Sequence, residues 1–138
     1  MNRYYIDTNI LIFISVDRDS IHNDIWEIIK DYNTKLYTSS VCVQEMIHLF
    51  QTGKLKSKEV KKTDDVFNLI SQAGIKIVSI SENHLKEYAR LPLYEGHNDP
   101  NDRLIISQAI SDKIPIISSD LKFALYQKNK LQFIRNKR

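Results

Sequence analysis

Apolar residues alternate along this chain between two spacings. Short runs with a strand-like pattern lie at residues 4–6, 35–38, 75–80, 114–118 and 131–134. Between these runs, apolar residues recur every three or four positions, which predicts helices over residues 21–32, 41–51, 57–72, 82–91 and 100–111. Strands that alternate with helices favour right-handed crossovers and a mostly parallel sheet. We therefore expect an α/β fold with a central sheet of four to five strands flanked by helices.

Length and composition fit one globular domain spanning residues 1–138. Hydrophobic residues make up 42% of the chain and charged residues 27%, which excludes a disordered or fibrous protein. Cys42 is the only cysteine, so an intramolecular disulfide or a thiolate zinc site is excluded. The apolar run at the start contains Asp7 and ends at Asp17, a pattern typical of neither a signal peptide nor a membrane span. We expect a cytoplasmic protein that does not contact membranes.

Positive charge is concentrated in two segments although the formal net charge is only +3. After Asp120, every ionisable side chain except that of Tyr126 is Lys or Arg. Residues 54–62 contain five lysines interrupted only by Glu59. Such clusters can neutralise the phosphates of a nucleic acid, but they can also be a solvated helix face and a frayed tail.

Two aspartates lie where a parallel sheet places its ligands. Asp7 follows the first predicted strand and Asp120 follows the fourth, and ligands bind beyond the carboxyl ends of such strands. An aspartate at a strand-to-helix junction can also cap the helix. Both interpretations stay open for each residue.

Glu45 shares one helical stripe with Cys42 and Met46, so it either faces the apolar side of its helix or reaches the edge of that side. Asp102 likewise leads an apolar stripe that continues with Ile105 and Ile106. Burying such acids costs free energy unless a cation compensates their charge.

The segment before Asp102 is typical of a helix start. Asp99 is expected at the N-cap and Pro100 at the first helical position, with Asp102 reaching back from the third. Arg103 is expected to point towards a neighbouring carboxylate or a phosphate. We expect His97 to be a loop residue rather than a metal ligand.

Oxygen ligands without a Cys or His cluster favour Mg²⁺ or Mn²⁺ over zinc. One or two such ions, about 3.5–4 Å apart if paired, would activate a water molecule and stabilise the leaving oxygen of a phosphodiester. The acids therefore indicate metal-dependent phosphodiester hydrolysis.

Four segments in order resemble the PIN-domain ribonucleases, specifically the VapC-type toxins of toxin–antitoxin pairs. They are Tyr5-Ile6-Asp7-Thr8-Asn9-Ile10-Leu11; Ser39-Ser40-Val41 leading to Glu45; His97 through Arg103 with the following Leu104-Ile105-Ile106-Ser107-Gln108-Ala109; and Ile117-Ser118-Ser119-Asp120 with Lys122-Phe123. The resemblance implies that Asp7, Glu45, Asp102 and Asp120 hold Mg²⁺ or Mn²⁺.

The same resemblance implies roles for the neighbours of these acids. The motif His97-x-Asp99-Pro100-x-Asp102-Arg103 matches a subgroup pattern in which Asp99 assists a second metal or only caps the helix. Asn9 would orient Asp7 or a metal-bound water, and Thr8 or Ser119 would bind a carboxylate.

The resemblance also implies an endoribonuclease that cuts flexible single-stranded RNA, leaving a 5′-phosphate and a 3′-hydroxyl. It further implies a homodimer that is inhibited by an antitoxin, which places a peptide segment across the acids. Apolar residues in segments 21–32 and 41–50, which a small domain need not bury completely, independently favour a dimer and a groove for an antitoxin helix.

Rival functions fit the residues less well. A haloacid-dehalogenase-like phosphatase needs a second Asp two residues after the first, where this chain has Asn9. A receiver domain needs paired acids after the first strand and a phosphoacceptor Asp after a middle strand, and the chain has neither. A PIN module that only binds RNA or protein would not need all four acids. A housekeeping PIN nuclease in RNA maturation remains the alternative to a toxin.

Overall fold

The computed structural model describes residues 2–137. The strands are β1 (Asn2–Ile6), β2 (Thr34–Ser39), β3 (Ile75–Val78), β4 (Ile116–Ser118) and β5 (Phe133–Arg135). The α-helices are α1 (Thr8–Val16), α2 (Asn23–Lys30), α3 (Ser40–Gln51), α4 (Asp65–Gln72), α5 (Glu82–Arg90) and α6 (Pro100–Asp112), and two 3₁₀ helices are η1 (Arg18–Ser20) and η2 (Leu121–Asn129). The strands form one parallel sheet in the order β3-β2-β1-β4-β5, which confirms the predicted α/β fold.

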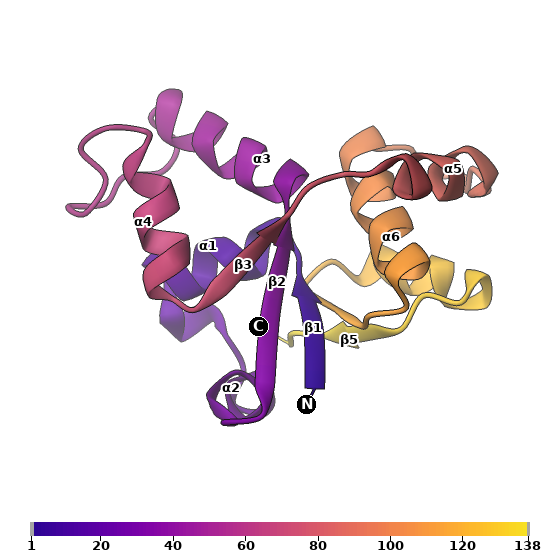
Figure 1. Ribbon diagram of the computed structural model, residues 1–138, viewed down its shortest axis with the longest axis horizontal. Helices are drawn as coiled ribbons and strands as arrows, with labels where there is room; N and C mark the ends of the chain where they lie inside the picture. The colour runs from indigo at the N-terminus through magenta and orange to yellow at the C-terminus, as the bar shows by residue number, and fades with distance from the viewer. Residues whose placement is uncertain (1, 138) are drawn as a thin grey trace.

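Helices cover both faces of this sheet (Figure 1). Helices α1, α2 and α4 lie on one side of it, and α5 and α6 lie on the other. Helix α3 starts at the carboxyl end of β2 and contacts α1, α4 and α6. The carboxyl edge of the sheet is therefore surrounded by the first turns of several helices.

Strands β1 and β4 lie at the centre of the sheet, and their burial explains why apolar runs in the sequence predicted them. Tyr5 and Ile6 of β1 are buried, and Ile116 and Ile117 of β4 are fully buried. A parallel strand covered on both faces needs a continuous apolar run rather than an alternating one. The registry of β1 with β4 places Ile6 beside Ile117, so Asp7 and Ser118 come next along the same edge.

Helix α1 is not among the predicted elements. Asp7 caps it, and its apolar residues run without a break from Ile10 to Ile14, so they lie on all sides of the helix. Because α1 packs against the sheet and against α3 and α4, it lacks the single apolar stripe that identifies a surface helix. Within residues 2–137, no helix, α1 included, is long and apolar enough to cross a membrane.

The helix predicted over residues 57–72 is wrong in its first half. Only Asp65–Gln72 is helical, and residues 57–64 form turns and bends. The carboxylate of Asp65 accepts hydrogen bonds from the backbone amides of Lys61 and Lys62, which holds this segment in a turn. Side-chain contacts of this kind compete with helix formation.

The apolar residues of segment 21–32 are buried only in part. Ile21 and Ile25 are buried in the core, and Trp26, Ile28 and Ile29 pack against it. The core therefore takes up part of the expected apolar stripe, and its other three residues stay partly exposed. The large apolar side chains that do remain exposed lie elsewhere, with Tyr32 as the exception at the end of the segment.

Candidate metal site

The four acids singled out by the sequence lie at the carboxyl edge of the sheet. Asp7 follows β1 and caps α1, and Asp120 lies two residues beyond β4 and caps η2. Glu45 belongs to α3, and Asp102 is the third residue of α6. Repulsion acts between Asp7 and both Asp102 and Glu45, and between Asp102 and Asp120, so the acids form one cluster. Asp7 and Asp120 therefore each cap a helix and also belong to the acidic cluster.

Asp7 is the buried member of the cluster, with 3% of its surface exposed. Its carboxylate accepts hydrogen bonds from the Ser118 hydroxyl at 2.7 Å, the Thr8 amide at 2.7 Å and the Asn9 side chain at 3.1 Å. Burial raises the pKa of Asp7 to about 7, the Ser118 hydrogen bond opposes this rise, and the charge of Asp102 adds to it. Three hydrogen bonds thus do not compensate for burial, whereas a bound cation would.

Glu45 lies at the rim of the buried side of α3. Cys42 and Met46 on the same stripe are fully buried, while Glu45 is partly exposed. The Thr8 hydroxyl donates a hydrogen bond to Oε1 of Glu45 at 2.5 Å. Thr8 thus makes the carboxylate contact expected of it, and this contact joins the start of α1 to α3.

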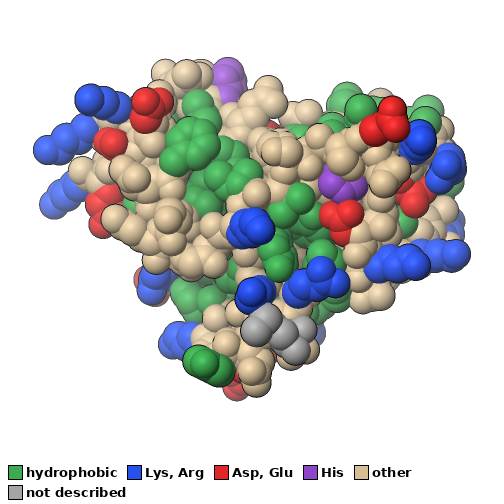
Figure 2. Space-filling view, viewed as in Figure 1, with side chains coloured by type: hydrophobic (Ala, Val, Ile, Leu, Met, Phe, Trp, Pro, Cys, Tyr) green, Lys and Arg blue, Asp and Glu red, His purple; other side chains and the backbone are tan. Residues whose placement is uncertain are grey.

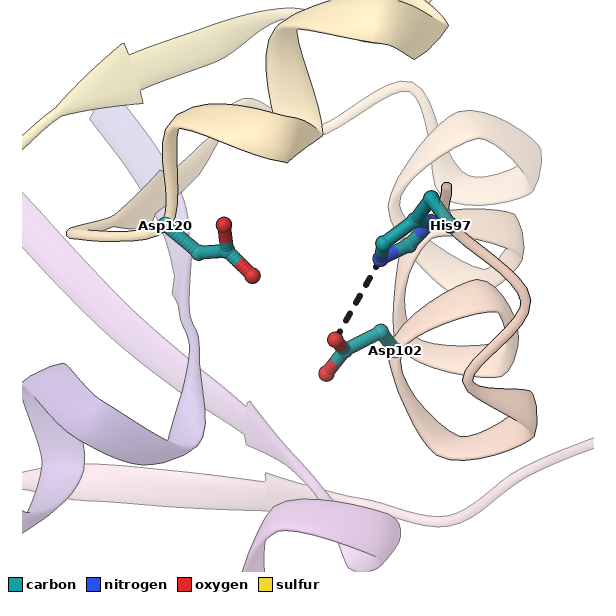
Figure 3. Close-up of side chains that lie close together, drawn as sticks. All are labelled: His97, Asp102 and Asp120. Atoms are coloured by element: carbon teal, nitrogen blue, oxygen red, sulfur yellow. Dashed lines mark hydrogen bonds and ion pairs between the residues drawn. The ribbon is translucent and has the colours of Figure 1, made fainter. Parts of the chain in front are cut away.

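His97, Asp102 and Asp120 form the tightest group of possible ligands in the described part of the chain. One ligand atom from each lies within 4.8 Å of the other two. Figure 3 shows His97 and Asp102 side by side, with the Asp120 carboxylate directed towards them from the opposite side. Burial, together with the charge of Asp99, raises the pKa of Asp102 to about 6, and the hydrogen bond from His97 opposes this rise.

The His97 ring is fixed at both nitrogens. Nε2 lies 3.3 Å from Oδ2 of Asp102, and Nδ1 lies 2.7 Å from the hydroxyl oxygen of Tyr126. An ionised carboxylate can only accept, so Nε2 donates to Asp102, and a neutral ring then accepts from Tyr126 at Nδ1. Phe123 and Tyr126 contact the ring in edge-to-face geometry, and only 4% of His97 is exposed. His97 is a loop residue, as expected, but its side chain belongs to the acidic cluster.

Asn9 joins the ends of the two central strands. Its side-chain nitrogen donates to Asp7, as expected, and its oxygen accepts from the backbone amide of Ser119 at 3.2 Å. Of the two residues expected to bind a carboxylate, Thr8 does so, and the hydroxyl of Ser119 accepts a hydrogen bond from Asn136. The serine that binds a carboxylate is its neighbour Ser118, whose side chain points to the same edge as Asp7.

Asp99 and Arg103 hold the backbone around α6. The carboxylate of Asp99 accepts from the amides of Asn101 and Asp102, which makes it the N-cap. The expectation that Arg103 points towards a neighbouring carboxylate or a phosphate is wrong. Its guanidinium is buried, donates to the carbonyl oxygens of Leu91 and Pro92 and lies over the Tyr88 ring. Arg103 therefore anchors the connection between α5 and α6 rather than a carboxylate or a phosphate. The expected reach of Asp102 back to the helix start is replaced by its contact with His97.

Sequence reasoning missed Ser118 and Tyr126 and undervalued His97. The signal for His97 was its place in the motif that also holds Asp99 and Asp102. Ser118 was readable as the polar residue that ends a fully apolar strand. No local pattern identifies Tyr126, because its contact with His97 spans 29 positions.

The chemistry of these residues fits a divalent cation. Four carboxylates converge, and among the described residues no Lys or Arg forms an ion pair with any of them. The raised pKa values of Asp7 and Asp102 reflect this uncompensated charge. Carboxylate oxygens suit Mg²⁺ and Mn²⁺, and an imidazole nitrogen beside them is compatible with Mn²⁺.

Comparison with known families gives one assignment. The family model of the PIN domain matches residues 4–129. A comparison with curated proteins gave no match.

Several solved structures share the fold over nearly the whole chain. A chain of the VapBC2 complex from Rickettsia felis, bound to a DNA fragment from its promoter, superposes with a TM-score of 0.68 at 21% identity, covering 98% of this chain and 99% of that one. A chain of DNA-bound VapBC from Salmonella typhimurium gives 0.67 at 16% identity, with 98% of each chain covered. VapBC-1 from nontypeable Haemophilus influenzae gives 0.64 at 18% identity, with 96% and 97% covered.

Proposed function

Because the chain belongs to the PIN domain family, we propose that it is a Mg²⁺- or Mn²⁺-dependent endoribonuclease and the toxin of a VapC-type toxin–antitoxin pair. PIN domains are generally nucleases that use divalent metals. The observation that carries the proposal is the convergence of Asp7, Glu45, Asp102 and Asp120 at one sheet edge without a neutralising Lys or Arg among the described residues.

Asp7, Glu45, Asp102 and Asp120 would hold the metal. When bound, a divalent ion supplies Lewis-acid chemistry, since it lowers the pKa of water and neutralises charge on the phosphate. The protein's own contribution is to fix the carboxylates in advance. Hydrogen bonds from Ser118 and Asn9 orient Asp7, and the Thr8 hydroxyl orients Glu45.

His97 is a positioning residue in this proposal. It holds Asp102 through Nε2, and Tyr126 fixes the ring through Nδ1. Second contacts of this kind fix the geometry of metal-binding carboxylates and are nearly as important as the ligands themselves.

The proposed substrate is single-stranded RNA. All five lysines of residues 54–62 are exposed between α3 and α4, and they offer positive charge to a phosphate backbone. Bases that are unpaired can be splayed out at an open sheet edge, whereas those of an A-form duplex cannot.

Two partners follow from the likeness to VapBC complexes. We propose a homodimer and a cognate antitoxin that covers the acids with a cationic segment. Such a segment would compete with the metal for the same carboxylates. A housekeeping nuclease would lack this partner, so inhibition by a protein encoded next to this chain separates the two functions.

The test is cleavage of single-stranded RNA by the purified chain with Mg²⁺ or Mn²⁺, beside the Asp7→Asn variant. Asn caps helices about as well as Asp and keeps the size of the side chain, so the fold should persist while most cleavage is lost. Ser119→Ala, which changes a hydroxyl that makes no contact with the acids, is the control and should cleave like the wild type. Full activity of Asp7→Asn would overturn the proposed site.

A further inference from the structure

A groove lies beside the acidic cluster between α3, α4 and β3. It has a volume of about 870 Å³, which is in the range of sites for drug-sized ligands. Thr8 and Glu45 line it at one end, so it is continuous with the candidate metal site. Figure 2 shows apolar side chains gathered between α3 and α4, where this groove opens.

The walls of the groove combine an aromatic ring with hydrogen-bonding edges. Phe67 of α4 lines it and is 47% exposed, so its ring is accessible from the groove. Ile47 and Ile77 supply further apolar surface. The side-chain amides of Gln44 and Asn101 line the same space and can both donate and accept hydrogen bonds.

The segment that joins the two helices flanking the groove is rich in lysine. The segment that joins α3 to α4 carries Lys54, Lys56, Lys58, Lys61 and Lys62, all of them exposed. Figure 2 shows Lys and Arg side chains projecting from this side of the molecule. A lysine-rich segment next to the groove attracts a polyanion such as RNA.

We propose that this groove, called here the α3–α4 groove, binds an unpaired nucleotide of the RNA next to the phosphate that is cut. This inference rests on the proposed function and deepens it, because it locates the contact that reads the substrate. The base stacks on Phe67, the amides of Gln44 and Asn101 bond to the base edge, and the lysines hold the adjoining phosphates. Stacking on aromatic rings and hydrogen bonding to exposed base edges are how proteins recognise single-stranded RNA.

The experiment measures RNA affinity in the Asp7→Asn background, in which the probe stays intact. The probes are a short fluorescein-labelled single-stranded RNA and an abasic chain of the same length. Phe67→Ala should weaken RNA binding by about 5- to 150-fold, the range expected when one base stack is removed, and should leave binding of the abasic chain unchanged. Phe67→Trp, which keeps a stacking ring, should bind RNA at least as tightly as the parent.

Tyr32→Ala is the matched control, since Tyr32 is an aromatic residue that is 97% exposed between α2 and β2, away from the groove. It should change neither affinity. Unchanged RNA affinity in Phe67→Ala, or an equal loss on both probes, would overturn the proposal. A variant that keeps RNA binding but no longer responds to the antitoxin would assign the groove to a protein partner and would also overturn it.

Cleavage by the wild-type chain is measured separately. If wild-type protein cleaves RNA and Phe67→Ala binds RNA normally, the groove proposal fails and the nuclease stands. If wild-type protein does not cleave RNA but Phe67→Ala loses affinity for it, the nuclease fails and the groove stands as an RNA site.

Discussion

At the scale of single residues, Asp99 and Asp102 show that the position of an aspartate on a helix determines what it binds. Asp99 accepts hydrogen bonds from two backbone amides at the start of α6, while Asp102, one turn further, contacts His97 and faces Asp120. The same side chain therefore stabilises a helix in one place and joins a charged cluster in the other.

This contrast predicts different losses for the two alanine variants. Asp102→Ala should abolish RNA cleavage, because it removes a proposed ligand. Asp99→Ala should lower the free energy of unfolding by about 0.5–2 kcal/mol, the value of an N-cap, with a smaller loss of activity. Cleavage rates and urea unfolding curves measured on both variants test this, and equal loss of activity at both positions would contradict the assignment.

The pKa of Asp7 predicts how stability depends on pH in the absence of metal. The folded-state pKa is about 7, well above the ordinary value near 3.9, because of burial. Between these pH values the unfolded chain releases a proton that the folded chain retains, so rising pH from 4 to 7 favours unfolding. Asp102, with a pKa of about 6, acts in the same direction.

In EDTA, urea unfolding should therefore give a higher free energy of unfolding for the wild type than for Asp7→Asn at pH 4. This difference should shrink as the pH rises to 7. Above pH 7 the metal-free variant should be as stable as the wild type or slightly more stable, since a repelling charge is gone. Mg²⁺ or Mn²⁺ should stabilise the wild type more than the variant at pH 7.5. A wild-type advantage that grows with pH in EDTA would show that Asp7 is a purely structural cap.

At the scale of elements, the structure differs from the helix predicted by sequence periodicity in the connection between α3 and α4. Lys58, Lys61 and Lys62 were expected on a helix, but the carboxylate of Asp65 accepts hydrogen bonds from the amides of Lys61 and Lys62, and the segment turns. The lysines are exposed on a connection rather than arranged along one helix face.

Changing Lys54, Lys56 and Lys58 together to Ala should weaken RNA binding at low salt. The logarithm of affinity should also depend less on the logarithm of salt, by about 0.7 for each phosphate that a lysine no longer neutralises. The matched control changes Lys35 and Lys76, which are exposed near the starts of β2 and β3, at the opposite edge of the sheet. An identical salt slope in the triple variant and the wild type would exclude this segment from RNA binding.

Helices and strands with one regular spacing of apolar residues could be predicted from the sequence. Elements that depend on contacts with distant parts of the chain could not. The buried ends of the central strands, Tyr5–Ile6 and Ile116–Ile117, are apolar because both faces are covered there, and the acids that follow them could be predicted from this pattern. Helix α1 was not predicted because its apolar residues lie on several sides of the helix. Within the site, the contacts of Ser118 with Asp7 and of Tyr126 with His97 join residues 111 and 29 positions apart, and no local pattern encodes them.

At the scale of the whole molecule, exposed apolar side chains indicate where a second protein would bind. Leu85, Leu93, Leu121 and Leu125 are exposed on α5, on the connection after it and on η2. Apolar surface that stays exposed often marks an interface. The segment 21–32, which was expected to provide such a surface, packs Ile21 and Ile25 into the core and leaves Trp26, Ile28 and Ile29 partly buried.

Light scattering at micromolar concentration should show a homodimer. Co-expression with a cognate antitoxin should give a complex that cleaves RNA far more slowly than the free protein, because a cationic side chain occupies the acids. A monomer in both samples would contradict the proposed assembly. A complex that cleaves as fast as the free chain would remove the toxin function and leave a housekeeping nuclease.

The order of strands in the sheet has a consequence for the ribosome that makes this chain. Strand β1 leaves the ribosome first, but it is completed on one side only by β4, and the hydroxyl that binds Asp7 belongs to Ser118. Contacts this distant in sequence form late. For the nuclease proposed above, stalled nascent chains that end before β4 should not cleave RNA, whereas released chains should. Such a nuclease would therefore be unable to cut the message that encodes it until its translation is nearly finished.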